Sequence, residues 1–436
     1  TQEAIDPVRF ISNHSTGKMG YALAEAAMQR GAEVTLVSGP VSLTPPPFVN
    51  VVSVTSAQDM YNAVTSLAPE QDAIVKAAAV ADYAPSQVST EKVKKKDNDM
   101  SIPLTRTQDI LKYLGEHKKS GQFLCGFSME TEHLLENSQT KLIKKNVDIY
   151  VTGSNAYMLS SEIATLISGR YVQIEMLPLS FKEYMQSTGS MEDRGIKYTE
   201  YLENSSFPYA LELKGHPNEI RDYLDGIFNT IVVKDILTRR KILDPLMLKS
   251  VLRYVFDNIG SPLSSKKIAD TLTSEGRKVD VKTVERYLDA LIESYIIYPA
   301  QRYNVKGKQY LKTLGKYYVV DIGMRFMLLG KRNTDAGHIL ENVIYLELLR
   351  RGYDVYVGKV DSFEVDFVAM NGNSTFYYQV ALSVRDADTL QRELRPLLSI
   401  RDHYPKYILT MDDDPEEQYD GIRRINARDW LLGLTD

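Results

Sequence analysis

Short apolar segments alternate with segments of helical periodicity through the first 151 residues, and this alternation constrains the fold more than any other feature. The segment from Ala73 to Ala79 is almost wholly apolar, which fits a central strand of a parallel sheet because both faces of such a strand are buried. We expect strands at 34–37, 49–54, 73–79, 123–127 and 147–151, and helices at 17–31, 57–67, 110–118 and 134–145. This order predicts an α/β fold with a doubly wound, Rossmann-like parallel sheet that binds ligands beyond the carboxyl ends of its strands.

The pattern changes after residue 155. A strand is expected at 171–176, and helices dominate from about 180 to 293. Helices at 247–259, 265–273 and 281–294 precede a strand-rich stretch at 296–320, which is the order of a winged helix-turn-helix. A small α/β domain follows, with helices at 338 onward and 389–400 and strands at 354–357, 365–370, 376–382 and 407–410. The predicted domains are 1–150, 151–240, 241–325 and 326–436.

Composition is ordinary for a globular protein, with 43% hydrophobic and 25% charged residues and a net charge of −5. No apolar run is long enough for a membrane span, and the first residues do not resemble a signal peptide, so we expect a cytoplasmic protein without membrane contact. The single cysteine, Cys125, excludes an internal disulfide and a multi-cysteine metal site.

Two glycines, Gly17 and Gly20, and several small polar residues mark the start of the first predicted helix. Backbone N–H groups at such a start can hold phosphate, although the spacing alone favours a capped, tightly packed helix. Lys141 and Lys145 lie four residues apart on one face of a predicted helix, and Lys92 opens a lysine-rich run. Taken alone, these lysines are typical of a solvated surface.

Four motifs in register resemble phosphopantothenate–cysteine ligase, the synthetase half of the bifunctional coenzyme A biosynthesis protein, over residues 1 to about 147. They are the runs 6–20, 77–83, 91–95 and 126–131. The resemblance implies that CTP with Mg²⁺ activates the carboxylate of 4′-phosphopantothenate as an acyl-cytidylate, that the cysteine amine then attacks, and that the protein is a homodimer. The ligase family also has a strand and a glycine-rich turn before the position of Thr1 and further segments after the last strand. Because these are not found here, we expect an incomplete active site.

The resemblance also implies residue roles. Asn13 matches the asparagine that handles the acyl-cytidylate, Arg9 a substrate-side arginine, and Lys92 the lysine that closes over the intermediate. The remaining positions match nucleotide or triphosphate contacts: Gly17, Gly20, Asp82, Gln108, Asp109, Ile110, Leu111, Phe127, Lys141 and Lys145. No metal-ligating residue is assigned in this ligase-like part.

From about residue 147 the chain resembles the later part of an AAA-type ATPase that carries winged-helix and endonuclease-like domains. In that family Ser154 or Asn155 would be a polar sensor, and Arg170 would read the γ-phosphate or form a surface ion pair. The phosphate-binding motif Gly-x-x-x-x-Gly-Lys-Ser/Thr is absent from the sequence, so we do not expect ATP hydrolysis. We interpret the chain as a fusion near residue 147. The alternative function is an ATPase remnant that acts as a DNA- or protein-binding module.

Residues 261–320 contain eleven Lys and Arg and six Asp and Glu. Lys278, Lys282 and Arg286 lie on or beside the expected recognition helix, so region 245–325 is predicted to contact DNA or to serve as a packing domain.

In the endonuclease-like part, Glu341, Asp366 and Gln379 would form the metal side of a nuclease centre. Ala381 occupies the position of the lysine, so nuclease activity is not expected.

Overall fold

The computed structural model describes residues 1–94, 101–128, 148–151, 174–189, 193–237, 242, 244–331, 335–372 and 374–435. The chain divides into two compact units. We call the described residues up to 151 the N-terminal unit and those from 174 onward the C-terminal unit. None of the described helices is both long and apolar enough to cross a membrane.

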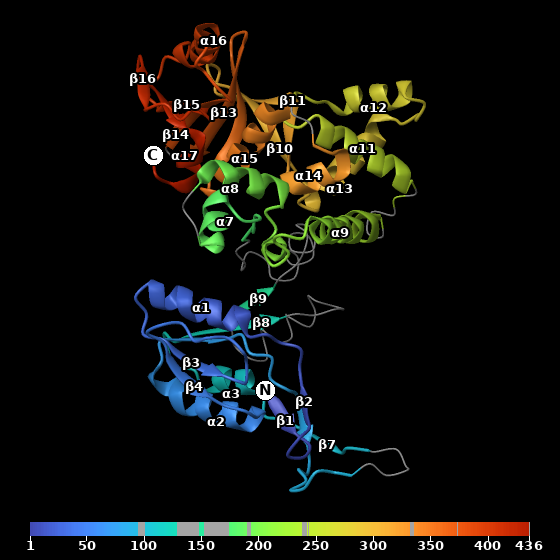
Figure 1. Cartoon of the computed structure of the whole chain (residues 1–436), viewed down its shortest axis with the longest axis vertical. Helices are drawn as coiled ribbons and strands as arrows, with labels where there is room; N and C mark the ends of the chain where they lie inside the picture. The colour runs from blue at the N-terminus through green and yellow to red at the C-terminus, as the bar shows by residue number, and fades with distance from the viewer. Residues whose placement is uncertain are drawn as a thin grey trace. The chain divides into compact units, whose positions relative to one another are not determined.

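The N-terminal unit contains short parallel strands with helices on both faces, together with two short antiparallel pairs. In chain order its elements are β1 (Gln2–Ala4), β2 (Phe10–Ser12), α1 (Lys18–Gln29), β3 (Thr35–Ser38), β4 (Asn50–Ser53), α2 (Ala57–Leu67), β5 (Ala73–Lys76), β6 (Tyr83–Pro85), β7 (Leu104–Arg106), α3 (Ile110–His117), β8 (Phe123–Ser128) and β9 (Asp148–Val151). The antiparallel pairs are β1–β2 and β6–β7. Figure 1 shows α1 on one side of the strands and α2 and α3 on the other. The predicted strands and helices of this part are confirmed, except the helix at 134–145, which lies outside the described residues.

The parallel strands form two sheets rather than the single sheet that we predicted. β3 pairs with β4, and β8 pairs with both β5 and β9, all in parallel. Among the described residues, no strand lies between β3 and β5. A parallel ladder needs adjacent strands, so the sheet is divided at this position. The coarser part of the predicted fold class, a mixed α/β fold with parallel strands consistent with a Rossmann-like domain, is confirmed, whereas a single doubly wound sheet is not found among the described residues.

Local sequence explains the helix boundaries in this unit. Ser56 accepts a hydrogen bond from the N–H of Asp59, and Asp59 accepts one from the N–H of Ser56, which is a capping box at the start of α2. Met60 on α2, Leu114 on α3 and Leu124 on β8 are buried together in one apolar cluster. Burial of each such side chain stabilises the fold by about 2 kcal/mol, so this cluster anchors both helices to the strands.

The C-terminal unit begins with a helical part. Its elements are α7 (Phe181–Thr188), α8 (Arg194–Glu203), α9 (Pro217–Phe228), a π-helical turn (Asn229–Ile236), α11 (Pro245–Asp257), α12 (Ser265–Ser274) and α13 (Val281–Glu293). The three helices expected between 247 and 294 are found as α11 to α13. The strand predicted at 171–176 is not found in its described part, 174–176, which has no regular structure.

An eight-stranded sheet follows and contains more strands than we predicted. Its strands are β10 (Ile297–Asn304), β11 (Gln309–Val319), β12 (Asp354–Val360), β13 (Phe363–Asn371), β14 (Ser374–Ala381), β15 (Lys406–Thr410), β16 (Glu417–Tyr419) and β17 (Ile422–Asn426), in the order β11-β10-β12-β13-β14-β15-β17-β16. β10 pairs with β12 in parallel, so hydrogen bonds of the sheet cross the domain boundary expected near residue 325.

Helices cover both faces of this sheet. The remaining helices are α14 (Ile322–Leu329), α15 (Ala336–Arg350), α16 (Ala387–Leu398) and α17 (Ala427–Leu432). Leu340 and Ile344 of α15 share an apolar cluster with Phe367, whereas Leu397 of α16 shares another with Val368. Because neighbouring positions of β13 face opposite sides, α15 and α16 lie on opposite faces (Figure 1).

Candidate functional site

The start of α1 has the geometry expected of an anion-binding turn. Gly17, which precedes the helix, has φ of 77°, a conformation that favours glycine. A Cβ added at Gly17 would also lie 2.9 Å from Cγ1 of Val41. The first turn of α1 has no acidic residue, and the hydroxyl of Thr16 accepts only a long hydrogen bond, at 3.5 Å, from the N–H of Lys18. The helix start is therefore suited to an anion.

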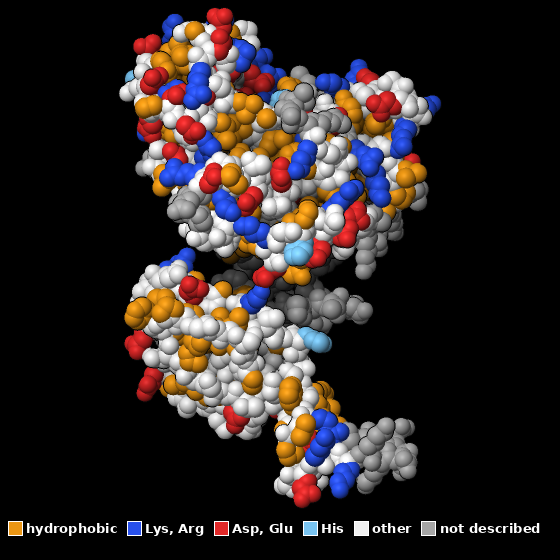
Figure 2. All heavy atoms as spheres, in the orientation of Figure 1, with side chains coloured by type: hydrophobic (Ala, Val, Ile, Leu, Met, Phe, Trp, Pro, Cys, Tyr) orange, Lys and Arg blue, Asp and Glu red, His pale blue; other side chains and the backbone are white. Residues whose placement is uncertain are grey.

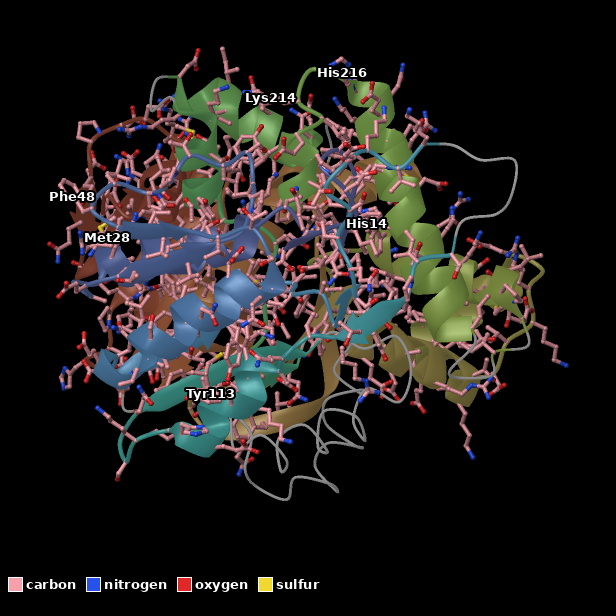
Figure 3. All side chains as sticks on the ribbon, turned by 90° about the horizontal axis from the view of Figure 1, so that it is seen from below. His14, Met28, Phe48, Tyr113, Lys214 and His216 are labelled. Atoms are coloured by element: carbon pink, nitrogen blue, oxygen red, sulfur yellow. The ribbon has the colours of Figure 1, made fainter. Side chains whose placement is uncertain are left out.

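Asn13 and Gly20 both contact the loop that follows β5. Nδ2 of Asn13 donates to the carbonyl of Val80 at 3.2 Å. A Cβ at Gly20 would lie 3.8 Å from Cβ of Ala77, an ordinary van der Waals distance. Asn13 is itself exposed, and so is His14 beside it, which is labelled in Figure 3. The loop before α1 therefore lies against the carboxyl end of β5 with its amide side chain at the surface.

Asp82 lies at the same edge. Thr107 fixes its position, since the N–H of Thr107 donates to the carbonyl of Asp82 at 3.0 Å and its hydroxyl donates to the carbonyl of Ala81 at 2.6 Å. The carboxylate of Asp82 is exposed. The loop after β5 and the segment before α3 are thus held side by side.

The segment 108–111 combines surface and core positions. Gln108 is exposed, and the carboxylate of Asp109 caps α3 by accepting from the N–H of Lys112 at 3.0 Å. The side chains of Ile110 and Leu111 are only 2% and 8% exposed and belong to the apolar cluster beneath. Any contact of these two residues with a nucleotide would therefore involve their backbone.

Phe127 lies at the carboxyl end of β8, next to this segment. A Cβ added at Gly126 would lie 2.7 Å from Cδ2 of Leu111, so the end of β8 packs closely against the start of α3. Phe127 is half-buried. The structure thereby brings Asn13, Gly17, Gly20, Asp82, Gln108, Asp109 and Phe127 to one edge of the N-terminal unit.

Arg9 is engaged within the protein. Its Nε donates to the Asp6 carboxylate at 2.9 Å, its Nη2 contacts the same oxygen, and Nη2 also donates to the carbonyl of Val93 at 2.7 Å. The hydrogen bond from Arg9, with backbone N–H groups of Val8, Val93 and Arg9, holds the pKa of Asp6 far below its ordinary value. This cluster fixes the chain next to Lys92, whose side chain is exposed.

Five of the residues singled out in the sequence lie outside the described part of the chain. They are Lys141, Lys145, Ser154, Asn155 and Arg170. The triphosphate contacts of the two lysines, the sensor role of Ser154 or Asn155, and the γ-phosphate contact or surface ion pair of Arg170 remain predictions.

The C-terminal unit contains a buried charged centre that only partly matches the predicted nuclease residues. Nζ of Lys316, on β11, lies 2.8 Å from Oε1 of Glu341 on α15, 3.0 Å from Oε1 of Glu364 and 3.6 Å from Oδ1 of Asp366. The hydroxyl of Tyr318 donates to Oε1 of Glu341 at 2.5 Å. We refer to Lys316, Tyr318, Glu341, Glu364 and Asp366 as the Lys316 centre.

Burial and charge shift the pKa values in the Lys316 centre. Burial and the Glu341 carboxylate raise the pKa of Asp366 to about 7, against the opposing effect of Lys316. Burial alone would raise the pKa of Glu341 and lower that of Lys316. The charges of Glu341, Asp366 and Glu364 outweigh burial and raise the pKa of Lys316. Lys316, with hydrogen bonds from His338 and Tyr318, likewise outweighs burial and lowers the pKa of Glu341.

The sequence analysis missed Lys316 because it looked for a lysine at Ala381, on β14. The detectable signal was the spacing of Lys316 and Tyr318, which places both side chains on one face of a strand.

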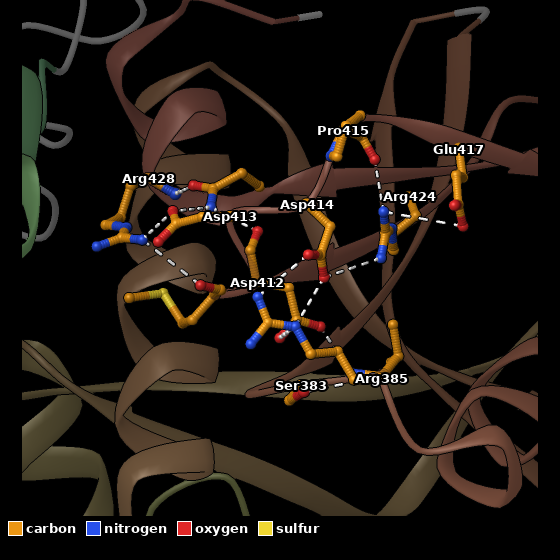
Figure 4. A network of polar contacts seen from close by, with 12 residues as sticks. Ser383, Arg385, Asp412, Asp413, Asp414, Pro415, Glu417, Arg424 and Arg428 are labelled. Atoms are coloured by element: carbon orange, nitrogen blue, oxygen red, sulfur yellow. Dashed lines mark hydrogen bonds and ion pairs between the residues drawn. The ribbon is translucent and has the colours of Figure 1, made fainter.

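A second acidic cluster of this unit, at 412–414, is paired with arginines. Arg385 contacts Asp412 and Asp414, and Arg428 contacts Asp413 (Figure 4). Arg424 joins Asp414 to Glu417 and donates to the carbonyl of Pro415. These contacts fasten the loop after β15, so the cluster has a structural explanation.

Two family models match the chain. One, described as the DNA/pantothenate metabolism flavoprotein C-terminal domain, covers residues 1–185. The other, a domain of unknown function named DUF8612, covers residues 196–335. The first match extends beyond the boundary near 147 that the motifs indicated.

An uncharacterized protein of Haemophilus influenzae is 38% identical to this chain over 332 residues, which cover 74% of this chain and 82% of that protein. The chain belongs to the family of this Haemophilus protein. The Bacillus subtilis coenzyme A biosynthesis bifunctional protein is 53% identical over 152 residues, 35% of this chain and 37% of that protein. The crystal structure of the C-terminal domain of a coenzyme A biosynthesis bifunctional protein matches at 49% identity and a TM-score of 0.31, covering 35% of this chain and 72% of that one.

Within this family, the present chain contains a segment of about 152 residues that is similar to the coenzyme A biosynthesis bifunctional protein. This chain spans well under half the length of that relative. The resemblance predicted for the first part of the chain is confirmed at this level. The ATPase, winged-helix and endonuclease resemblances of the remainder stay predictions.

Proposed function

We propose that the N-terminal unit is a phosphopantothenate–cysteine ligase-like segment that binds CTP at the edge formed by Asn13, Gly17, Asp82 and the start of α3. The observation that supports this most is the convergence of these positions from separate segments of the chain at the carboxyl ends of β5 and β8. Nucleotides bind at such an edge in parallel α/β sheets.

In this proposal each residue has a chemical task. The N-terminal end of α1 holds phosphate through backbone N–H groups. The amide of Asn13 is fixed by Val80 and would contact the cytidylate group, both in bound CTP and in the acyl-cytidylate. Asp82 is an exposed carboxylate of the kind that Mg²⁺ accepts beside phosphates, where the ion would neutralise triphosphate charge. Lys92, next to the Arg9–Asp6 pair, would approach the acyl-cytidylate before cysteine attacks.

Isothermal titration of the full chain with CTP and Mg²⁺ tests this proposal, with ATP and Mg²⁺ as the comparison. Asn13→Ala and Asp82→Ala should each weaken CTP binding at least tenfold, the loss that corresponds to about 1.4 kcal/mol. Gln29→Ala, at the other end of α1, is the matched control and should bind like the wild type. Absence of heat at millimolar CTP, or equal binding by Asn13→Ala, would contradict the proposal. Release of pyrophosphate with 4′-phosphopantothenate then tests ligation, and sedimentation tests the homodimer.

A second function is favoured by the exposed basic residues of α13. Lys282 and Arg286 on this helix and Lys278 just before it are exposed, and α11 to α13 are followed by the β10–β11 hairpin, the order of a winged helix. Figure 2 shows Lys and Arg side chains grouped on this part of the C-terminal unit. We propose that region 245–325 binds duplex DNA.

Fluorescence anisotropy with a labelled duplex tests this second function. Lys282→Ala with Arg286→Ala should weaken binding and reduce its salt dependence, because two phosphate contacts are lost. Glu285→Gln, an acidic residue on the same helix, is the control and should leave binding unchanged or tighter. Equal binding by the double variant and the wild type would refute DNA contact through α13.

A further inference from the structure

The Lys316 centre has the carboxylates of a metal site but holds its own cation. Lys316 is 5% exposed, and its Nζ lies within 3.0 Å of one oxygen from Glu341 and one from Glu364. Divalent cations in proteins lie about 2.0–2.6 Å from carboxylate oxygens. An ion bridging Glu341 and Glu364 would therefore coincide with the ammonium of Lys316.

The other groups of the centre are also committed to partners. Asp366 accepts from the N–H of Val380 at 2.9 Å through its second oxygen. Gln379, predicted on the metal side, accepts from the N–H of Asp366 at 2.9 Å and donates to Glu393 at 2.8 Å. The side chain of Gln379 thus positions Asp366 and is not directed to an ion.

Neighbouring residues close the remaining sides. Nη2 of Arg302 lies 4.0 Å from the second oxygen of Glu364, which supplies another positive charge. Gly260 has φ of +68°, and a Cβ added there would lie 3.0 Å from Oε2 of Glu341 and 2.8 Å from Nδ1 of His338. The predicted metal ligands therefore do not fit a divalent ion while Lys316 is in place.

We propose that Lys316 is a fixed internal counter-ion that occupies the position of a divalent cation. The Lys316 centre of the C-terminal sheet then binds no divalent metal ion. Lysine and carboxylates then connect three parts of the unit: β11 through Lys316, α15 through Glu341, and β13 through Glu364 and Asp366. DNA contact by region 245–325 would accordingly occur without metal-dependent cleavage at this centre.

Titration of the full chain with Mn²⁺, with free Mn²⁺ followed by electron paramagnetic resonance, tests this inference. The wild type and Asp366→Asn should bind the same amount of Mn²⁺ up to millimolar concentration. Lys316→Met should bind Mn²⁺ at least tenfold more tightly, which corresponds to about 1.4 kcal/mol, because the ammonium no longer competes with the ion for the oxygens of Glu341 and Glu364. Lys316→Met with Asp366→Asn should lose this gain. Lys306→Met, at an exposed lysine, is the matched control and should gain nothing.

Two outcomes would overturn the inference. The first is Mn²⁺ binding by the wild type that disappears in Asp366→Asn, because the carboxylates would then hold a metal beside the lysine. The second is a folded Lys316→Met variant with no gain in Mn²⁺ affinity. If Lys316→Met does not fold, the comparison of the wild type with Asp366→Asn still shows whether the carboxylates bind Mn²⁺, since both proteins retain the lysine.

Discussion

Replacing Lys316 by methionine should destabilise the C-terminal unit strongly, and the structure allows the effect to be bounded. The side chains of Lys316 and Glu341 are 5% and 8% exposed, so the carboxylate left behind cannot be solvated by water. Removal of one partner from a buried ion pair costs about 3–5 kcal/mol. With a urea dependence of about 3 kcal/mol per molar, the upper end of the usual range because the dependence grows with the size of the unfolding unit, the midpoint of unfolding should fall by roughly 1–2 M.

Trp430 provides the assay. It is the one tryptophan of the chain, is 1% exposed, and belongs to the same apolar cluster as Leu340 and Ile344 of α15. Its fluorescence during urea unfolding therefore reports on the unit that contains the Lys316 centre. Lys306→Met is the matched control, since Lys306 is 52% exposed and its ion pair with Asp361 should contribute less than about 1 kcal/mol.

A double-mutant cycle with Glu341→Gln tests the cause. The cost of Lys316→Met should be smaller when Glu341 is already neutral, with a coupling of about 1 kcal/mol or more between the two sites. Without Lys316 the native carboxylates have raised pKa values and bind protons that the unfolded chain does not. The loss of stability caused by Lys316→Met should therefore grow as the pH rises from 5 to 8. Additive single effects, or a Lys316→Met cost equal to that of Lys306→Met, would refute this reasoning.

Three further variants have expected outcomes. Asp366 faces Lys316, Glu341, Glu364 and Glu393, and its pKa is raised to about 7, so the native state takes up a proton that the unfolded chain does not. The stability of the wild type relative to Asp366→Asn should therefore increase as the pH falls from 7 towards 4, by up to about 4 kcal/mol. Urea unfolding followed by Trp430 fluorescence measures this difference. Gly323→Ala should destabilise the same unit by about 1–3 kcal/mol, because the new Cβ would lie 2.8 Å from the backbone of Ser205; an unchanged midpoint would contradict this packing. Asp6→Asn should lower the melting temperature of the N-terminal unit at pH 7. The difference from the wild type should begin to shrink as the pH falls below the ordinary pKa of an aspartate and should be lost only near the lowered pKa of Asp6, because the native carboxylate stays ionised between these two values while the unfolded one takes up a proton; circular dichroism at several pH values measures both.

Much of the fold could be predicted because long periodic segments carry their own signal. Helices such as α2 and α13 and strands such as β13 and β15 lie within a few residues of their predicted positions. The strands β1, β2, β6 and β7 were missed because each has three residues, too few to show a period of two. The pairing of β10 with β12 was missed because the paired residues, such as Arg302 and Val357, are more than fifty positions apart in the sequence. No local pattern specifies such a register.

The two candidate sites also differ in how far the sequence predicts them. Asn13, Gly17 and Asp82 could be selected from motifs and lie at one edge because parallel strands end there together. The Lys316 centre could not be derived from spacing. Its lysine comes from β11 and its carboxylates from α15 and β13, so the centre exists only once the sheet and α15 have assembled.

The parallel ladder between β10 and β12 limits how this protein can be divided for study. A truncation at residue 325 would remove β10 and leave the backbone N–H and carbonyl groups of residues 357–359 on an open sheet edge. The excised remainder would also lose the ammonium that balances Glu341. Shortened versions that keep α11 through α17 together avoid both defects, and separately expressed halves are expected to aggregate.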